Sequence, residues 1–152
     1  MEVINGMVVD YSQDQRIYSQ DIMTDTYGVC QEVKDILREL SDRFSLAYEQ
    51  CFDIKIILSE LLQNAIKHGN KCDTNKKIHI DIWFKEQSKT LGIRIKDQGH
   101  GFDSPPKYIS KNLSEGEPML NESGRGLNIV KALSDGIKFN TEGNTITVLK
   151  KI

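Results

Sequence analysis

The chain has 152 residues, 38% of them hydrophobic and 28% charged, with a formal net charge of −2. This length suits one domain with a single core, and the charge gives no reason to expect nucleic acid, which selects clustered Lys and Arg. Three widely spaced cysteines without a CxxC pair predict neither disulfides nor a zinc site, but free thiols in a reducing cytoplasm. No signal peptide or membrane-spanning run is recognisable, so we expect a cytoplasmic protein without a membrane partner.

The N-terminal part of the chain predicts strands followed by a helix. An Asn-Gly pair at 5–6, between two short apolar runs, is a hairpin signal. Residues 16–22 alternate weakly and are a further candidate strand. Thr24 or Asp25 can then cap a helix that runs to about Phe44, because apolar residues recur there at helical spacing.

The second predicted helix has the clearest pattern in the chain. Asp53 is a plausible N-cap, and Gly69 is a natural C-terminal stop. Between them lies an apolar stripe with i, i+3, i+4, i+7 spacing, made of Ile54, Ile57, Leu58, Leu61, Leu62 and Ala65. Such a stripe predicts a helix packed against the core.

The rest of the chain predicts two hairpins separated by a long loop and a short helix. Residues 77–84 and 90–97 alternate with period two. Residues 102–123 hold all three prolines and little periodicity, which predicts a long loop of a kind that is usually functional or disordered. Residues 126–135 predict a short helix and residues 136–151 a closing hairpin.

The order of these elements predicts the fold class. Strands and helices do not alternate strictly, which argues against a doubly wound parallel sheet. We expect an α+β fold of two layers, in which helices cover one face of a mixed, mostly antiparallel sheet. The whole chain, residues 1–152, is predicted to form one domain.

A polar stripe on the second helix is the first candidate for chemistry. Glu60, Asn64, Lys67 and His68 follow i, i+4, i+7, i+8 spacing, away from the apolar stripe. Asn is a poor residue for a helix interior, but its amide oxygen is a good ligand for Mg²⁺, and a carboxylate one turn away can accept a proton. From spacing alone, a solvated helix face is the simpler interpretation.

Two glycine-containing segments are further candidates. Asp97-Gln98-Gly99-His100-Gly101 follows a predicted strand and can be a simple turn. Alternatively, Asp97 can accept a hydrogen bond from an exocyclic amine, beside glycines that let a flat ring approach the backbone. Gly124-Arg125-Gly126-Leu127 precedes the short helix, with Ser123 as a possible N-cap. It can be a flexible loop end, or an anion site at a helix N-terminus. A P-loop motif is absent from the sequence.

Taken in order, these segments resemble the motifs of the GHKL ATPases, whose nucleotide site is called the Bergerat fold. That family has an E-x-x-x-N box, a D-x-G-x-G box, a mobile ATP lid, a G-x-G-L box and a late strand threonine. The matching segments are Glu60 to Asn64, Asp97 to Gly101, the loop 102–123, Gly124 to Leu127, and Thr145. The resemblance covers roughly residues 53 to 150 and implies a histidine-kinase-like ATPase domain that binds ATP and Mg²⁺.

The resemblance also implies a role for individual residues. Glu60 would be the general base and Asn64 the Mg²⁺ ligand. Asp97 would hold the adenine amine, supported by Gly101 and Thr145. Asn144 stands where a glycine usually precedes that threonine, so Thr147 is the alternative. The other residues expected to bind nucleotide are Lys67, His68, Gly99, Gly124, Arg125, Gly126 and Leu127.

Within the superfamily, the segments SELLQNAIKHGN and ESGRGLNIVKALSD resemble the bacterial anti-sigma factor serine/threonine-protein kinases. This implies a kinase that phosphorylates a serine of an antagonist (anti-anti-sigma) protein and sequesters a sigma factor, as part of transcription regulation. Relatives are often dimers, so a homodimer is also expected. Two alternatives stay open: a nucleotide-gated partner-binding module without kinase activity, and a free-standing histidine-kinase-like catalytic domain.

Overall fold

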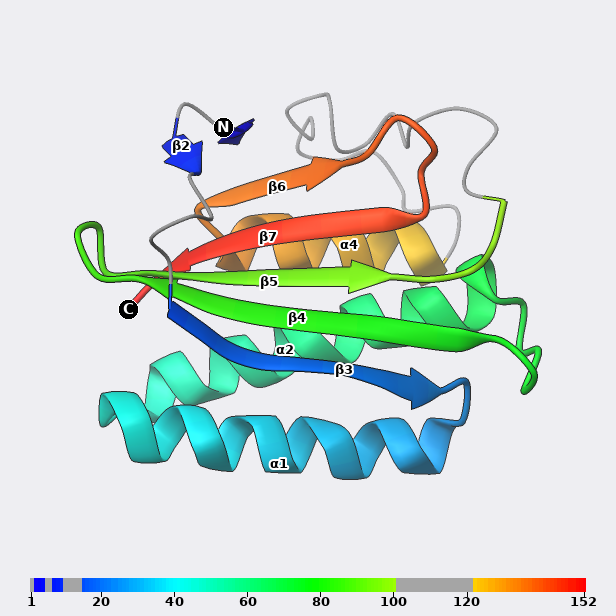
Figure 1. Cartoon of the computed structure of the whole chain (residues 1–152), viewed down its shortest axis with the longest axis horizontal. Coiled ribbons are helices and arrows are strands. Elements are labelled where there is room, and N and C mark those ends of the chain that lie inside the picture. The colour runs from blue at the N-terminus through cyan, green and yellow to red at the C-terminus, as the bar shows by residue number, and fades with distance from the viewer. Residues whose placement is uncertain (1, 5–6, 10–14, 101–121) are drawn as a thin grey trace.

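The fold is a two-layer α+β sandwich, as predicted, in a computed structural model that describes residues 2–4, 7–9, 15–100 and 122–152. Three helices cover one face of a five-stranded sheet (Figure 1). Its strands are β3 (Gln15–Met23), β4 (Lys77–Lys85), β5 (Thr90–Lys96), β6 (Gly136–Phe139) and β7 (Thr145–Lys151). Their order is β3-β4-β5-β7-β6, and every neighbouring pair is antiparallel.

The sheet separates an apolar face from a polar one because side chains alternate along each strand. On the helix side, Ile80 of β4, Ile93 of β5 and Val148 of β7 are fully buried in the main core. On the other side, a hairpin of β1 (Glu2–Ile4) and β2 (Met7–Val9) contributes Ile4, which packs in a small second cluster with Trp83 and Leu149. The pairing of β1 with β2 confirms the predicted hairpin, although residues 5–6 of its turn lie outside the described residues.

Helix α1 (Thr26–Phe44) begins where the sequence predicts. The Asp25 side chain accepts hydrogen bonds from the backbone N–H groups of Tyr27 and Gly28, at 3.3 and 3.1 Å. These bonds satisfy two of the N–H groups that a helix start leaves without partners. Asp25 is therefore the N-cap.

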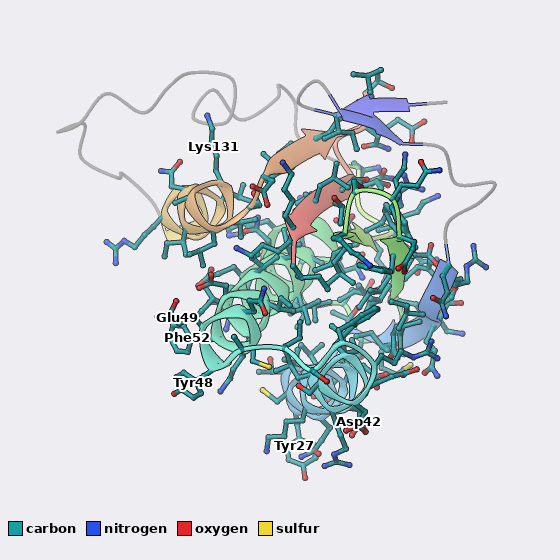
Figure 2. All side chains as sticks on the ribbon, turned by 90° about the vertical axis from the view of Figure 1, so that its left-hand side faces the viewer. Tyr27, Asp42, Tyr48, Glu49, Phe52 and Lys131 are labelled. Atoms are coloured by element: carbon teal, nitrogen blue, oxygen red, sulfur yellow. The ribbon has the colours of Figure 1, made fainter. Side chains whose placement is uncertain are left out.

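Helix α2 (Tyr48–Asn64) begins earlier than predicted, and Asp53 is not its cap. The Gln50 side chain accepts from the backbone N–H of Ala47 at 3.0 Å, while Asp53 lies inside the helix and pairs with Lys150 at 3.3 Å. The start of the helix was missed because its apolar residues Tyr48 and Phe52 are exposed and add nothing to the apolar stripe (Figure 2). The stripe therefore marks only the buried part of the helix.

The end of α2 continues as a π-helical turn, η1 (Ala65–Gly69), in which the N–H of Asn70 donates to the carbonyl of Ala65 at 2.7 Å. Helix α4 (Glu122–Leu133) also differs from the prediction, since Ser123 lies inside it and not at its cap. Residues 102–121 of the predicted loop lie outside the described residues. In the described part, no helix has the length and apolarity needed to cross a membrane.

Candidate nucleotide-binding site

A small cavity joins the E-x-x-x-N helix to the end of β5. Its polar lining consists of Asn64, His68 and Asp97. Its apolar lining comes from α2 and from strands β5 and β7, and consists of Leu61, Ala65, Ile95 and Ile146. A few polar groups converging on apolar walls are the usual composition of a site for a flat organic ring.

Asp97 reaches the cavity because β5 ends at Lys96 and the following backbone stays anchored to β7. The N–H of Asp97 donates to the carbonyl of Asn144 at 3.0 Å, and the Asp97 carboxylate accepts from the N–H of Gly99 at 2.8 Å. Burial raises the pKa of the Asp97 carboxyl, because removal from water disfavours the charged form; the Gly99 hydrogen bond and nearby Lys76 partly oppose this. A desolvated acceptor of this kind suits a ligand that brings its own N–H donors.

Glycines let the end of α2 and the D-x-G-x-G segment touch each other. A Cβ at Gly69 would collide with the Asp97 carboxylate, and a Cβ at Gly99 would collide with the carbonyl oxygen of Gly69. The two segments therefore meet at a distance that only glycine allows. Gly99 is thus needed for packing against Gly69, a reason the sequence did not reveal.

Asn70 holds this junction together, although it lies outside the predicted nucleotide-binding residues. Its side chain is fully buried and donates to Thr24 Oγ1 at 2.8 Å and to the carbonyl of Lys77 at 3.0 Å. Its Oδ1 accepts from the N–H of Gln98 at 2.7 Å, and the Gln98 side chain accepts from the N–H of Lys77, also at 2.7 Å. One amide thereby connects the start of α1, the start of β4 and the D-x-G-x-G segment.

Glu60 lies one turn before Asn64 on α2 and faces α4. A Cβ on Gly126 would collide with Glu60 Oε2, so the carboxylate packs directly on the backbone of α4. Gly126 and Leu127 are buried, whereas Arg125 is exposed. The two glycines of the G-x-G-L box thus lie inside the first turns of α4, not ahead of it as expected, and Gly101 lies outside the described residues.

The oxygen ligands that the protein offers suit a magnesium ion that is coordinated mainly by phosphate and water. Asn64, the predicted metal ligand, supplies an amide oxygen at the cavity. Among the described residues, no group of three His, Cys, Asp or Glu side chains could hold a metal ion. Mg²⁺ usually takes one or two protein oxygens and completes its shell with water and phosphate, so this donor set suits it.

The two candidate threonines do not line the cavity. Thr145 and Thr147 lie on the opposite face of β7, where Thr147 Oγ1 accepts from Arg94 Nε at 3.1 Å. Ile146, between them, lines the cavity instead. The strand was predicted, but not which of its side chains faces the cavity, because Thr145, Ile146 and Thr147 alternate between its two sides.

The structure therefore brings together part of the predicted residue set. Asn64, His68 and Asp97 line one cavity; Gly99 packs beside it; and Glu60 and Gly126 are in contact. Lys67 is exposed on η1. Gly143, at the turn before β7 with a φ of 76°, also lines the cavity and was missed, although a Gly-Asn pair between two strands is a recognisable turn signal.

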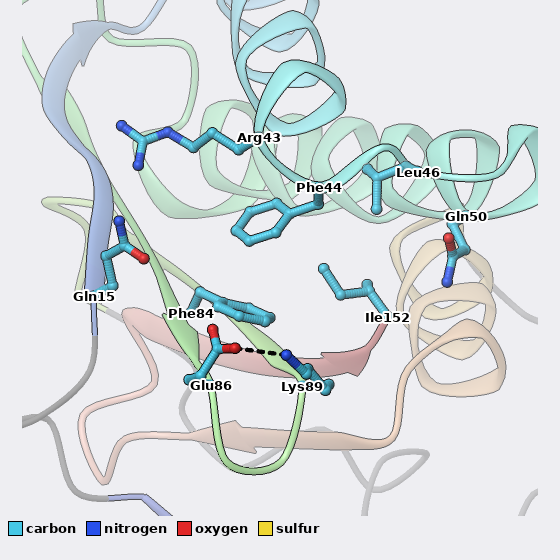
Figure 3. Close-up of a pocket in the computed structure, with 9 residues that line it drawn as sticks. All are labelled: Gln15, Arg43, Phe44, Leu46, Gln50, Phe84, Glu86, Lys89 and Ile152. Carbon is cyan, nitrogen blue, oxygen red and sulfur yellow. Dashed lines mark hydrogen bonds and ion pairs between the residues drawn. The ribbon is translucent and has the colours of Figure 1, made fainter.

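A second hollow lies at the other end of the sheet and contains none of the predicted residues. Phe44 and Phe84 form its floor with ring centroids 4.5 Å apart, and Lys89 pairs with Glu86 at 2.6 Å on its rim (Figure 3). The cations at this rim are paired with acids, as Arg43 is with Glu39 at 3.2 Å. The predicted motifs thus gather at one end of the molecule.

Comparison with known proteins identifies the family of the chain. A family model described as a histidine kinase-like ATPase domain matches residues 25–150. Over 120 residues the chain is 34% identical to the serine-protein kinase RsbW of Staphylococcus aureus, covering 74% of this chain and 75% of that protein. Over 110 residues it is 32% identical to an anti-sigma F factor of Clostridium perfringens, covering 68% and 73%. Over 118 residues it is 30% identical to RsbW of Oceanobacillus iheyensis, covering 76% and 73%.

Proposed function

Because the chain belongs to the histidine kinase-like ATPase family, we propose that it is an ATP- and Mg²⁺-dependent protein serine/threonine kinase. The observation that carries this proposal is the arrangement of three side chains, two on α2 and one directly after β5. Glu60 contacts the start of α4, Asn64 lines the cavity one turn later, and Asp97 faces the same cavity from β5. This arrangement supports the proposed roles of Glu60 as base, Asn64 as metal ligand and Asp97 as the acid that binds the ring.

In this proposal the protein acts by positioning and by charge. Asp97 accepts the adenine amine between the apolar walls of the cavity, supported by the backbone around Gly99 and with His68 beside it. Asn64 would hold Mg²⁺, which when bound neutralises charge on the phosphates. Glu60 accepts the proton of the attacking hydroxyl, because an in-line phosphoryl transfer needs an oriented nucleophile more than covalent catalysis.

The relatives' names suggest the partners. Proteins called serine-protein kinase and anti-sigma F factor support an acceptor serine on an antagonist protein and a sigma factor as the sequestered partner. Arg125, exposed on the first turns of α4, and Lys67 on η1 are proposed to lie near the phosphates, together with Gly124. The protein is proposed to work in the cytoplasm, where such partners occur.

The substitution Glu60→Gln tests the catalytic assignment. It removes the base but keeps the shape, so ATP binding should stay within about threefold while phosphoryl transfer falls by about 10² to 10⁴. Binding is measured by titration with a fluorescent ATP analogue, and transfer with labelled ATP, Mg²⁺ and candidate acceptor proteins. Equal phosphorylation by the variant would contradict the role of Glu60.

The chemistry of the product separates the alternatives. A phosphorylated product that survives acid is expected for serine, whereas an acid-labile product would indicate a histidine kinase-like transfer. ATP binding with no labelled product for any partner would indicate a binding module in which nucleotide only controls partner affinity. Failure to bind ATP at millimolar Mg²⁺ would contradict all three.

A further inference from the structure

The turn that joins β6 to β7 lies beside the candidate nucleotide site, at the same end of the sheet as the end of β5 (Figure 1). It runs from Asn140 to Asn144, and its residue Gly143 lines the cavity. The N–H of Gly143 donates to the carbonyl of Asn140 at 3.1 Å, and Gly143 has a φ of 76°. Only glycine adopts that conformation without strain. The turn is therefore tightly folded and forms part of the cavity wall.

The side chain of Asn140 holds the last part of this turn. Its Oδ1 accepts from the backbone N–H groups of Asn144 and Thr145, at 3.0 and 3.1 Å. Its Nδ2 donates to Asn144 Oδ1 at 2.8 Å, and the same oxygen accepts from Thr145 Oγ1 at 3.2 Å. One side chain thus makes three hydrogen bonds to two consecutive residues, which fixes the backbone of both.

The backbone carbonyl of Asn144 connects this turn to Asp97. It accepts from the N–H of Asp97 at 3.0 Å, directly after the end of β5. The Asp97 carboxylate also accepts from the N–H of Gly99 at 2.8 Å, but that bond lies within the D-x-G-x-G segment. The bond to Asn144 ties Asp97 to the neighbouring strand, so a shift of Asn144 would move the carboxylate.

The next residue of the segment, Gln98, is held by a different part of the molecule. Its N–H donates to the buried side chain of Asn70 at 2.7 Å. The first two N–H groups of the D-x-G-x-G segment thus depend on different asparagines, since Asn70 binds Gln98 directly and Asn140 acts on Asp97 through Asn144. A fault in the turn should therefore loosen Asp97 more than Gln98.

An asparagine at the start of a turn often does no more than stabilise the turn itself. Asn140 differs in its position, because the residue that it holds is the one whose carbonyl binds Asp97. Its own side chain lies outside the cavity lining, so it acts on the site only through Asn144. A carboxylate displaced by about 1 Å would lose its contact with a ring amine, while the apolar walls would still bind the ring.

We propose that Asn140 is a positioning residue for nucleotide selectivity. Through Asn144 it holds Asp97 at the position from which the carboxylate accepts the exocyclic amine of adenine. This inference rests on the proposed function, because it takes Asp97 as the group that binds the amine. It adds to that function the residue that makes the site select purines with a 6-amino group. Loss of Asn140 should therefore reduce the preference for the amine more than it reduces nucleotide binding as a whole.

The test compares ATP with purine riboside triphosphate, which carries hydrogen in place of the amine, in binding titrations of the full chain with Mg²⁺. Wild type should bind ATP about tenfold more tightly, as expected for one hydrogen bond to a charged group. Asn140→Ala should reduce this preference to about twofold, mainly by weakening ATP. Asn140→Asp keeps an acceptor for both backbone N–H groups and should stay within about twofold of the wild-type preference. Thr141→Ala, exposed in the same turn, is the control and should match wild type.

Amide hydrogen exchange gives a second measurement, without nucleotide. In Asn140→Ala the N–H of Asp97 should exchange about tenfold faster, because the turn that holds its acceptor opens more often. The N–H of Gln98, held by Asn70, should keep its rate within about twofold. A general loss of stability would instead accelerate both amides and weaken both nucleotides in the same ratio.

An unchanged ATP preference in Asn140→Ala, or equal acceleration of both amides, overturns the proposal while leaving the proposed function in place. If Asn140→Ala does not fold, Asn144→Ala is measured in the same way. That variant removes one partner of the Asn140 side chain but keeps the carbonyl, so about a threefold loss of preference is expected, and no loss overturns the proposal. A wild-type chain that binds both nucleotides equally would contradict the role of Asp97 itself, and this inference with it.

Discussion

Two faces of one strand, β5, show how differently neighbouring residues are constrained. Ile95 and Asp97 point to the helix side, where close backbone contacts and the buried Asn70 amide hold the D-x-G-x-G segment in place. Arg94 and Lys96 point to the open side, where they line a polar groove. A change on the helix side of β5 should therefore disturb nucleotide binding and stability together, and a change on its open side should leave nucleotide binding intact.

The largest loss of stability on the helix side is expected from Asn70→Ala. It removes three side-chain hydrogen bonds and leaves the N–H of Gln98 and the carbonyl of Lys77 without their buried partner. We expect a loss of about 2–4 kcal/mol in the free energy of unfolding. Urea denaturation measures it, together with ATP affinity. The exposed Asn75→Ala is the control and should change stability by less than about 0.5 kcal/mol.

A second strong effect is expected from Gly99→Ala. The new Cβ would meet the Gly69 carbonyl, so either η1 or the D-x-G-x-G segment must move, at a cost of about 1–3 kcal/mol. ATP affinity should fall in the same variant because Asp97 moves with the segment. Gly28→Ala in the first turn of α1 is the control. The nearest neighbour of its new Cβ would be Asp25, at 3.3 Å, so the free energy of unfolding should stay the same or rise slightly. Unchanged ATP binding in Gly99→Ala would contradict the proposed junction.

On the open face, Ile4→Ala should reduce stability without touching the nucleotide site. Ile4 is 1% exposed against Trp83 and Leu149, and losing its burial should cost about 1.5 kcal/mol. Thermal unfolding measures the loss, and ATP titration should give the wild-type affinity. The exposed Val3→Ala in the same strand serves as control, with a much smaller change expected. A drop in ATP affinity for Ile4→Ala would show that the two faces are coupled.

The smallest change in stability is expected from Asp97→Asn, and it depends on pH. Burial raises the pKa of Asp97, so the folded protein binds this proton more tightly than the unfolded chain does. The ionised group thus costs stability above the ordinary carboxyl pKa of about 3.9, and the cost disappears as pH falls below that value. Asp97→Asn should therefore be more stable than wild type at pH 7 and equal to it in acid, while binding ATP less well. Urea titrations at both pH values check this, with the exposed Asp42→Asn as control (Figure 2).

Most of the fold could be predicted because it rests on local patterns. Period-two alternation predicted β4 and β5, the closing hairpin predicted β6 and β7, and a cap at Thr24 or Asp25 predicted the start of α1. The start of α2 could not be predicted from apolar spacing, because its first turn is exposed and is capped through the side chain of Gln50. Candidate-site residues held by one helix or one turn, such as Glu60, Asn64 and Asp97, were predicted from the resemblance of their motifs to the GHKL boxes, whereas spacing alone left a solvated helix face and a simple turn open.

The sequence by itself determined the α+β class and the order of the motifs, and its resemblance to the GHKL ATPases predicted a shared nucleotide site for Asn64, His68 and Asp97, which line one cavity. Only the tertiary structure decided which face of β7 meets the cavity, so that Ile146 lines it and Thr145 does not. It also decided that Asn70 joins three distant segments and that the turn after β6 holds the backbone of Asp97. Spacing along the chain describes neighbours within one element, whereas register and close approach arise only when separate elements pack together.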